Sequence, residues 1–303
     1  SILRGARVWN LVHPVCVPAR RFVSMISTDS SLEYIEAEDG TRLAFAATPA
    51  TRPESGPGIV FLGGFMSDMT GQKATVLENW AQESGRAFLR LDYSGHGQSG
   101  GAFRDGTIGR WCADALCVIR HAGKAVPGLG AGLVLVGSSM GGWMAALLGR
   151  ELGQDGPGQR ISGLVTIAAA PDFTTDLMPA RLGKEVLAQI EKNGFYEAPS
   201  EYSENPYIIT RALLEDGRDN LVLAAPLELD IPARLIHGTA DLDVPWAQSE
   251  KLMNALTSTD VELILIKDGD HRLSAPEDLA RLTRIVETLC DQLSINNASR
   301  PAR

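Results

Sequence analysis

One stretch decides the fold: Leu133-Val134-Leu135-Val136-Gly137-Ser138-Ser139-Met140-Gly141-Gly142. Its four leading apolar residues show no polar alternation, which predicts a strand buried on both faces, as in a parallel sheet. The small residues that follow predict a sharp turn, and a helix is expected to begin at Met140. The stretch therefore predicts one strand–turn–helix unit of a sheet that helices cover on both sides.

Strands and helices alternate on both sides of this unit. Leu32 to Phe45 is expected to form a hairpin, because alternating apolar residues flank the turn dipeptide Asp39-Gly40. Further strands are expected at 59–62, 87–91, 163–169, 234–236 and 261–266, and helices at 72–84, 107–121, 247–257 and 276–292. This order predicts the α/β class, with a mostly parallel sheet covered by helices on both faces.

The alternation is interrupted between Pro171 and Pro232. Helix-like stretches at 178–193 and 206–216 predict a helical lid over the open edge of the sheet, at about residues 171–232. The alternative interpretation is a helical packing unit without a functional role.

The two ends of the chain differ from the α/β domain that we expect at residues 29–292. Residues 1–28 contain four arginines and no acidic residue, which predicts either a disordered leader or a mitochondrial transit peptide. A translation start at Met25 is a third interpretation. Residues 293–303 are expected to form a flexible tail. We expect a cytoplasmic protein, or a mitochondrial matrix protein if the leader is a transit peptide.

The composition excludes several classes of protein. An apolar fraction of 44% and a charged fraction of 21% are typical of a folded chain. The net charge of −9 argues against nucleic acid as a partner. The uncharged stretch 125–148 contains Pro127 and six glycines, so we expect a strand, a turn and a helix there, and no membrane segment. The four cysteines show no CxxC or metal-ligand spacing, which predicts no disulfide framework, no metal site and a reducing compartment.

The motif G-x-S-x-G occupies residues 137–141, at the end of the central expected strand. A serine on a strand-to-helix turn needs small residues on either side, because its backbone adopts strained dihedral angles. Its hydroxyl then projects beyond the carboxyl end of the strand, where the helix N-terminus stabilises negative charge. This register makes Ser139 the nucleophile and Ser138 a bystander.

A serine nucleophile needs a histidine base. Among the five histidines, His271 follows the last expected strand in a loop at its carboxyl end, and we assign it as the base. His96 lies in the turn-rich segment Asp92–Ser99 and is interpreted as a turn residue. His237 ends a strand and is interpreted as a buried histidine with its hydrogen bonds satisfied.

The base in turn needs an acid that orients it. Asp241 and Asp243 both follow the strand before the last one, and we prefer Asp241, three residues before Val244. The chain order Ser139, Asp241, His271 is the order that the α/β-hydrolase fold requires. It differs from the orders of chymotrypsin-like and subtilisin-like chains.

Acyl transfer also needs two N–H groups directed at the oxyanion. We expect one from Met140, directly after the nucleophile, and the other from Phe65, after the turn Gly63-Gly64. Flexible thioethers suit an adaptable acyl pocket, and five of the seven methionines lie near these segments or in the lid: Met66, Met69, Met140, Met144 and Met178. The candidate substrate-binding residues are Met66 and Met178 for the acyl group, Tyr202 of the lid for the leaving group, and Arg272 for an anionic group.

Several segments resemble the family of the mitochondrial mycophenolic acid acyl-glucuronide esterase, also described as a palmitoyl-protein thioesterase, within the α/β-hydrolase superfamily. The resemblance extends over roughly residues 32–292 and rests on six segments: Gly64–Ala74, Asp92–Gly97, Gly137–Trp143, Pro199–Ser203, His237–Trp246 and Asp270–Arg272. It implies an α/β-hydrolase fold and a serine esterase or thioesterase whose triad is Ser139, Asp241 and His271. The chain departs from the family at Gly63, where proline is usual, and in the sequence Asp-Leu-Asp at 241–243, where the family tends to have adjacent acids.

The expected chemistry is two-step acyl transfer to and from Ser139, with no metal or organic cofactor. The resemblance implies a small-molecule ester or thioester, or an acylated protein, as the substrate. A serine peptidase shares the triad order, and a non-catalytic binding protein shares the fold, so both remain alternatives. Dehalogenases and epoxide hydrolases of this fold are disfavoured, because they use a carboxylate where Ser139 stands.

Overall fold

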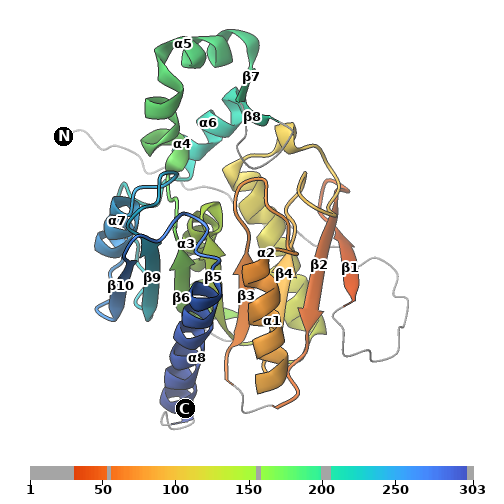
Figure 1. Ribbon diagram of the computed structural model, residues 1–303. Coiled ribbons are helices and arrows are strands. Elements are labelled where there is room, and N and C mark those ends of the chain that lie inside the picture. The colour runs from red at the N-terminus through yellow and green to blue at the C-terminus, as the bar shows by residue number, and fades with distance from the viewer. Residues whose placement is uncertain (1–30, 53–55, 155–157, 199–205, 299–303) are drawn as a thin grey trace, which may run out of the picture.

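The computed structural model describes residues 31–298, except 53–55, 155–157 and 199–205. At its centre lies an eight-stranded sheet with the order β1-β2-β4-β3-β5-β6-β9-β10 (Figure 1). Its strands are β1 (Leu32–Glu36), β2 (Arg42–Thr48), β3 (Gly58–Leu62), β4 (Phe88–Leu91), β5 (Gly132–Ser138), β6 (Arg160–Ile167), β9 (Ala233–Gly238) and β10 (Val261–Ile266). Strand β2 is antiparallel to both of its neighbours, and the remaining pairs are parallel. The mostly parallel α/β sheet is therefore confirmed.

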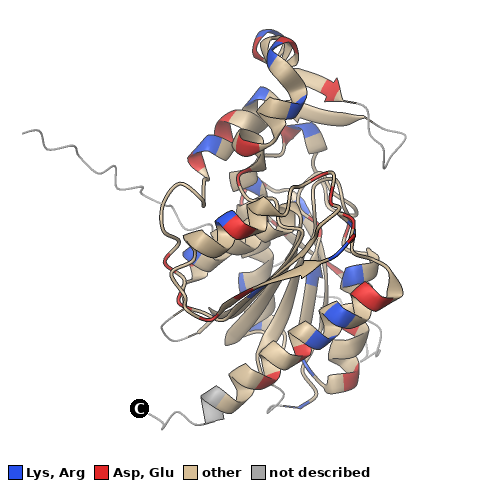
Figure 2. Ribbon diagram, turned by 60° about the vertical axis from the view of Figure 1, so that its left-hand side comes forward, with Lys and Arg blue, Asp and Glu red and all other residues tan. Residues whose placement is uncertain are grey.

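Helices cover both faces of this sheet. One face packs against α1 (Gln72–Ser84) and α8 (Pro276–Ala298), and the other against α2 (Ile108–Ala125), α3 (Met140–Leu152) and α7 (Ala247–Ala255). Figure 2 shows acidic and basic residues interspersed on the outer helices, while the strands are mostly uncharged. Apolar burial on both faces explains why the central strands are apolar throughout.

The central unit has the structure that its sequence predicts. Residues 133–136 of β5 are fully buried, and α3 begins at Met140. The uncharged stretch 125–148 thus forms a strand and a helix. No helix in the described parts of the chain is long and apolar enough to cross a membrane.

The segment between β6 and β9, where we expected a lid and which we call the lid from here on, lies above one end of the sheet (Figure 1). It contains α4 (Phe173–Asp176), α5 (Met178–Asn193), α6 (Arg211–Asp219) and a two-stranded sheet of β7 (Phe195–Ala198) and β8 (Tyr207–Thr210). The helix expected at 178–193 is confirmed, with a break at Gly183, whose φ is 74° and ψ is 167°. The helix expected at 206–216 is wrong at its start, because residues 207–210 pair with β7 as a strand. The Thr210 side chain then caps α6 by accepting the N–H of Leu213 at 3.1 Å.

Two other expectations need correction. The final helix extends to Ala298, so the flexible tail expected at 293–303 is helical over its first six residues, and buried Leu293 packs in the core beneath it. Cys112 and Cys290 are free and buried, whereas Cys117 is disulfide-bonded. The bond at Cys117 differs from the reduced cysteines that we expected for a reducing compartment. The leader expected at 1–28 and residues 299–303 lie outside the described residues.

Candidate active site

Ser139 lies at the sharp turn between β5 and α3, in a backbone conformation that is rare for any residue except glycine. Its φ is 55° and its ψ is −118°, values found mainly at functional sites where the surrounding structure enforces them. A Cβ added at Gly137 would lie 2.2 Å from the carbonyl oxygen of Gly141, and one added at Gly141 would lie 2.0 Å from that of Leu62. The motif therefore needs glycine on both sides of the serine, because no side chain fits there.

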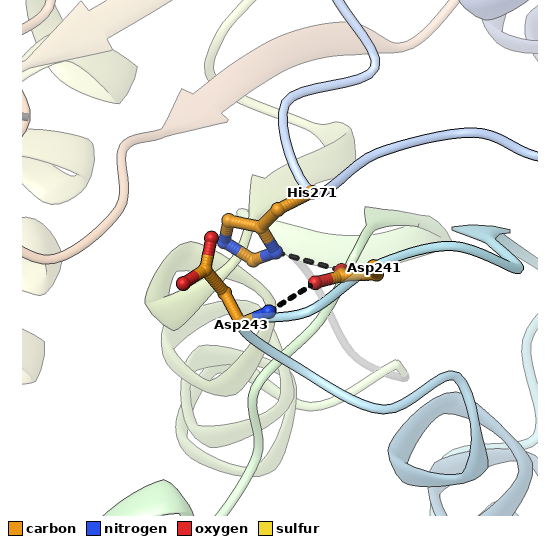
Figure 3. Close-up of side chains that lie close together, drawn as sticks. All are labelled: Asp241, Asp243 and His271. Carbon is orange, nitrogen blue, oxygen red and sulfur yellow. Dashed lines mark hydrogen bonds and ion pairs between the residues drawn. The ribbon is translucent and has the colours of Figure 1, made fainter. Parts of the chain in front are cut away.

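His271 and Asp241 meet Ser139 at the same end of the sheet. His271 follows β10, and its Nε2 lies 3.0 Å from Ser139 Oγ. Asp241 follows β9, and its Oδ2 lies 2.7 Å from His271 Nδ1 (Figure 3). These are the distances of a nucleophile, a base and an orienting acid in hydrogen-bond contact. The structure thus brings together the three residues that the sequence singled out.

The Asp241 carboxylate is fully buried and accepts hydrogen bonds at both oxygens. Oδ1 accepts the backbone N–H groups of Asp243 at 2.9 Å and Val244 at 2.8 Å, and Oδ2 accepts from both His271 and His237. Burial alone raises the pKa of Asp241, but the hydrogen bonds from His237, His271 and Val244 outweigh it and hold the pKa well below its usual range. Asp241 is therefore ionised under ordinary conditions.

Asp243 plays a different part in the same loop. Its backbone N–H binds Asp241, while its side chain lines the cavity beside His271 (Figure 3). One ligand atom each from Asp241, Asp243 and His271 lie within 4.8 Å of one another. Both Asp241 oxygens already accept N–H groups, so this set is organised for hydrogen bonding and is a poor cage for a metal ion.

His237 is fully buried behind Asp241, as the sequence predicts for a satisfied histidine. Its Nε2 lies 3.0 Å from Asp241 Oδ2 and 2.9 Å from the Val244 carbonyl oxygen, and its Nδ1 lies 2.7 Å from Ser249 Oγ. Because a carbonyl can only accept, Nε2 carries the proton, and Nδ1 accepts from the Ser249 hydroxyl. The Asp241 carboxylate is thus held by two imidazole rings.

The two expected oxyanion donors come from two different segments beside Ser139. Met140 is the first residue of α3, and Phe65 belongs to the loop after β3. A Cβ added at Gly64 would lie 3.4 Å from the Cβ of Ser139, so this loop passes directly beside Ser139. Within the described part of the chain, neither the Phe65 nor the Met140 N–H donates to another protein group, and both residues line the cavity.

A cavity of about 590 Å³ opens above the three residues, between the sheet and the lid. It contains three of the four candidate substrate-binding residues, Met66, Met178 and Arg272, and Tyr202 lies outside the described residues. Its apolar lining also comes from both parts of the structure: Phe65, Met140, Ala170, Phe173, Leu177, Leu182, Ala198, Tyr207, Ile209 and Val244. Met69 and Met144 are buried in the core and are not part of the lining.

Two cations at this site carried no recognisable signal in the sequence. Lys73 of α1 donates to the Arg272 carbonyl oxygen and to Ser274 Oγ at 3.2 Å, and burial lowers the pKa of Lys73 to about 8. Arg181 of α5 donates to the carbonyl oxygens of Leu242, at 2.9 Å, and Asp243. Both side chains bind loops that lie far away along the chain, so no local motif announces them.

Comparisons with known proteins bear on the family and the fold of the chain. Residues 58–213 match the family model described as Serine aminopeptidase, S33. The chain is 32% identical over 268 residues to the Palmitoyl-protein thioesterase ABHD10, mitochondrial, of Bos taurus, covering 88% of this chain and 82% of that protein. A crystal structure of a putative hydrolase from Agrobacterium vitis S4 shares 43% identity with a TM-score of 0.79, over 86% of this chain and 98% of that one.

The alpha/beta hydrolase domain-containing protein 10 from mouse is similar in structure as well. It shares 31% identity with a TM-score of 0.75, and the alignment covers 87% of this chain and all of that one. Sequence and structure thus agree over most of the chain. The chain belongs to the α/β hydrolases, in the family of ABHD10.

Proposed function

We propose that this hydrolase cleaves carboxylic esters or thioesters with Ser139 as its nucleophile. The observation that carries the proposal is the continuous contact from Ser139 Oγ through His271 to the buried Asp241 carboxylate, at 3.0 and 2.7 Å. The strained conformation of Ser139 supports it further, because such strain is retained where function requires it.

The mechanism follows from the positions of these groups. His271 Nε2 takes the proton of Ser139 Oγ as the oxygen attacks the carbonyl carbon, and ionised Asp241 stabilises the imidazolium that forms. The N–H groups of Phe65 and Met140 stabilise the oxyanion. His271 then gives its proton to the leaving group. In the second step His271 takes a proton from water as the water attacks the acyl-enzyme. The proton then returns to Ser139 Oγ, and the carboxylic acid is released.

The cavity lining supports an apolar acyl group as the substrate. Aromatic and aliphatic side chains surround the nucleophile, and Met66 and Met178 supply flexible thioethers that adapt to different chains. The relatives are named palmitoyl-protein thioesterase, which agrees with a long acyl chain. Arg272 also lines the cavity, and its positive charge suits an acyl ester with an anionic leaving group, such as an acyl glucuronide. An acylated protein is a further candidate substrate.

The charges that line the cavity bear on the peptidase alternative. An aminopeptidase must bind the ammonium group at the start of its substrate, for which carboxylates are suited. The described lining residues include one acidic side chain, Asp243, and three basic ones, Lys73, Arg181 and Arg272. This balance favours ester or thioester cleavage.

The relatives also bear on the location of the protein. Their names place them in mitochondria, and we propose the same location here. The cytoplasmic location that we expected first has no support from the relatives.

Labelling with a fluorophosphonate probe tests the nucleophile. We expect wild type and Ser138→Ala to be labelled, and Ser139→Ala to remain unlabelled while keeping its fold. Labelling of folded Ser139→Ala, or none of folded wild type, would contradict the proposal. Hydrolysis of p-nitrophenyl esters and acyl thioesters of increasing chain length, an acyl glucuronide and an aminoacyl amide then identifies the substrate class.

A further inference from the structure

The segment Asp92–Ser99, which follows β4, has no role in the chemistry described so far. Because β4 pairs with β3, the segment lies beside residues 63–71, which follow β3 and which we call the oxyanion loop. Three of its side chains bind the backbone of that loop: Tyr93 Oη donates to the Gly63 carbonyl oxygen at 3.3 Å, His96 Nε2 accepts the Met66 N–H at 3.3 Å, and Asp92 Oδ1 accepts the Met69 N–H at 2.7 Å. The segment therefore contacts the oxyanion loop at its start, its middle and its end.

The hydrogen bonds of His96 define its protonation. Its Nδ1 lies 3.2 Å from the Ser94 carbonyl oxygen, which also accepts the Trp111 indole N–H at 3.1 Å. A carbonyl only accepts, so Nδ1 carries the proton; the Met66 N–H only donates, so Nε2 carries none. Burial lowers the pKa of His96 to about 4, which keeps the ring in this neutral form. A protonated His96 would lose its bond to Met66.

The backbone of Met66 adopts a strained conformation that the hydrogen bond to His96 helps to hold. Its φ is 57°, in the left-handed region that side chains other than glycine rarely occupy. Strained backbone of this kind persists where neighbouring groups hold it. Met66 directly follows Phe65, so the bond to His96 sets the orientation of the peptide group next to the expected oxyanion donor.

The Phe65 ring is held by the same group of side chains. Its centroid lies 4.9 Å from that of Phe103 and 5.9 Å from that of Trp111, both edge to face. The His96 ring packs against the same two rings, at 5.1 Å each. The backbone after Phe65 and the ring of Phe65 are thus fixed by one cluster centred on His96.

We propose that His96 is a positioning residue for the oxyanion hole: as a hydrogen-bond acceptor for the Met66 N–H, it keeps the Phe65 N–H directed at the reacting carbonyl. The inference rests on the proposed function. Tyr93 and Asp92 hold the two ends of the loop, and His96 holds the part next to the donor. Its contribution appears in the transition state and the tetrahedral intermediate, because the bound substrate carries no oxyanion.

His96→Leu and His96→Gln test this role with an ester that the wild type hydrolyses. Leucine removes the acceptor, whereas the glutamine side-chain oxygen can reach the position of Nε2. We expect His96→Leu to lower kcat by about 10- to 100-fold with KM changed by less than about twofold. We expect His96→Gln to recover most of kcat. A trifluoromethyl ketone, which forms a tetrahedral oxyanion with the serine, should lose affinity for His96→Leu in proportion to kcat/KM.

His121→Leu is the matched control, because His121 is partly buried, packs edge to face on Phe45 and is outside the catalytic machinery. It should keep kcat and the affinity for the ketone. Tyr93→Phe removes a single hydroxyl and keeps the test open if His96→Leu does not fold; we expect a smaller fall in kcat at constant KM. Unchanged kcat in both His96→Leu and Tyr93→Phe, or a fall in kcat without a loss of ketone affinity, would overturn the inference. A wild type that neither hydrolyses esters nor reacts with the fluorophosphonate would overturn the proposed function itself.

Discussion

The floor and the roof of the cavity are built in different ways. The floor consists of the Ser139 turn and the loops after β3, β9 and β10, and the roof is the lid. Helix α3 of the floor buries ten of its thirteen residues, whereas α5 of the roof buries one of sixteen, Ile190. A closely packed helix holds its first residue in a fixed place, and a loosely packed one can adjust to what lies beneath it. We therefore expect floor substitutions to change the rate of the chemical step, and roof substitutions to change the choice of substrate.

The largest effect is expected at the reacting atoms of the floor. Ser139→Ala and His271→Ala should each lower kcat by at least about 10⁴-fold, because the members of a triad act as one unit. Steady-state ester hydrolysis measures the loss, and circular dichroism checks the fold. The double variant should be little worse than either single one. Intact turnover in folded His271→Ala would show that the base is assigned wrongly.

The two acids of the floor loop provide a matched pair. Asp241→Asn should lower kcat by about 10³- to 10⁴-fold, because the neutral amide stabilises the imidazolium poorly, and its NH2 group cannot accept the two backbone N–H groups that bind Oδ1. Asp243→Asn keeps its backbone N–H on Asp241, so we expect a fall of no more than about tenfold. The comparison uses kcat of both variants on one ester. A larger loss in Asp243→Asn would reverse the assignment of the acid.

Met178 tests the roof. Replacement by tryptophan should fill part of the cavity and lower kcat/KM for the longest acyl chains by about tenfold, while short acyl esters change little. Ala180→Trp on the same helix is the control, because Ala180 is exposed and outside the cavity lining. The measurement is kcat/KM of both variants for a series of esters of increasing acyl-chain length. Equal losses for all chain lengths in Met178→Trp would remove the distinction between floor and roof.

The smallest expected effect is a pH dependence of the stability of the floor. Hydrogen bonds lower the pKa of Asp241 in the folded protein, so its ionised form stabilises the fold above the pKa of the unfolded chain, near 3.9, and this stability is lost as the pH falls further. Urea unfolding of wild type and Asp241→Asn should therefore show a free-energy gap that is full at pH 6 and narrows below about pH 4. Ala180→Trp is the control: its free energy of unfolding should differ from that of the wild type by the same amount at every pH. A gap that widens on acidification would contradict the assigned direction of the pKa shift.

The sequence predicted the floor better than the roof, for physical reasons. The strand at 133–136 is recognisable because burial on both faces excludes polar residues. Ser139, Asp241 and His271 are recognisable because each follows a strand of the same sheet. The strand at Tyr207–Thr210 was mistaken for part of a helix, since it exists only by pairing with β7 and its apolar residues continue the spacing of α6.

The segment Asp92–Ser99 was noticed, but its role was not. Its partners in residues 63–71 lie some thirty positions earlier, and only the pairing of β3 with β4 brings them together. Lys73 and Arg181 were missed for the same reason, because their partner loops are more distant still. Contacts between remote segments follow from the order of the strands, which composition and spacing do not specify.

The break at Gly183 divides α5 into two parts. Every residue of α5 that lines the cavity, namely Met178, Arg181 and Leu182, precedes the break. A side chain added at Gly183 would meet no neighbour within 4 Å, so this position needs glycine for its positive φ and not for lack of space. The cavity face of α5 is thus confined to residues 178–182, and Arg181 among them also binds the loop after Asp241, so variation in acyl preference is best sought at Met178 and Leu182.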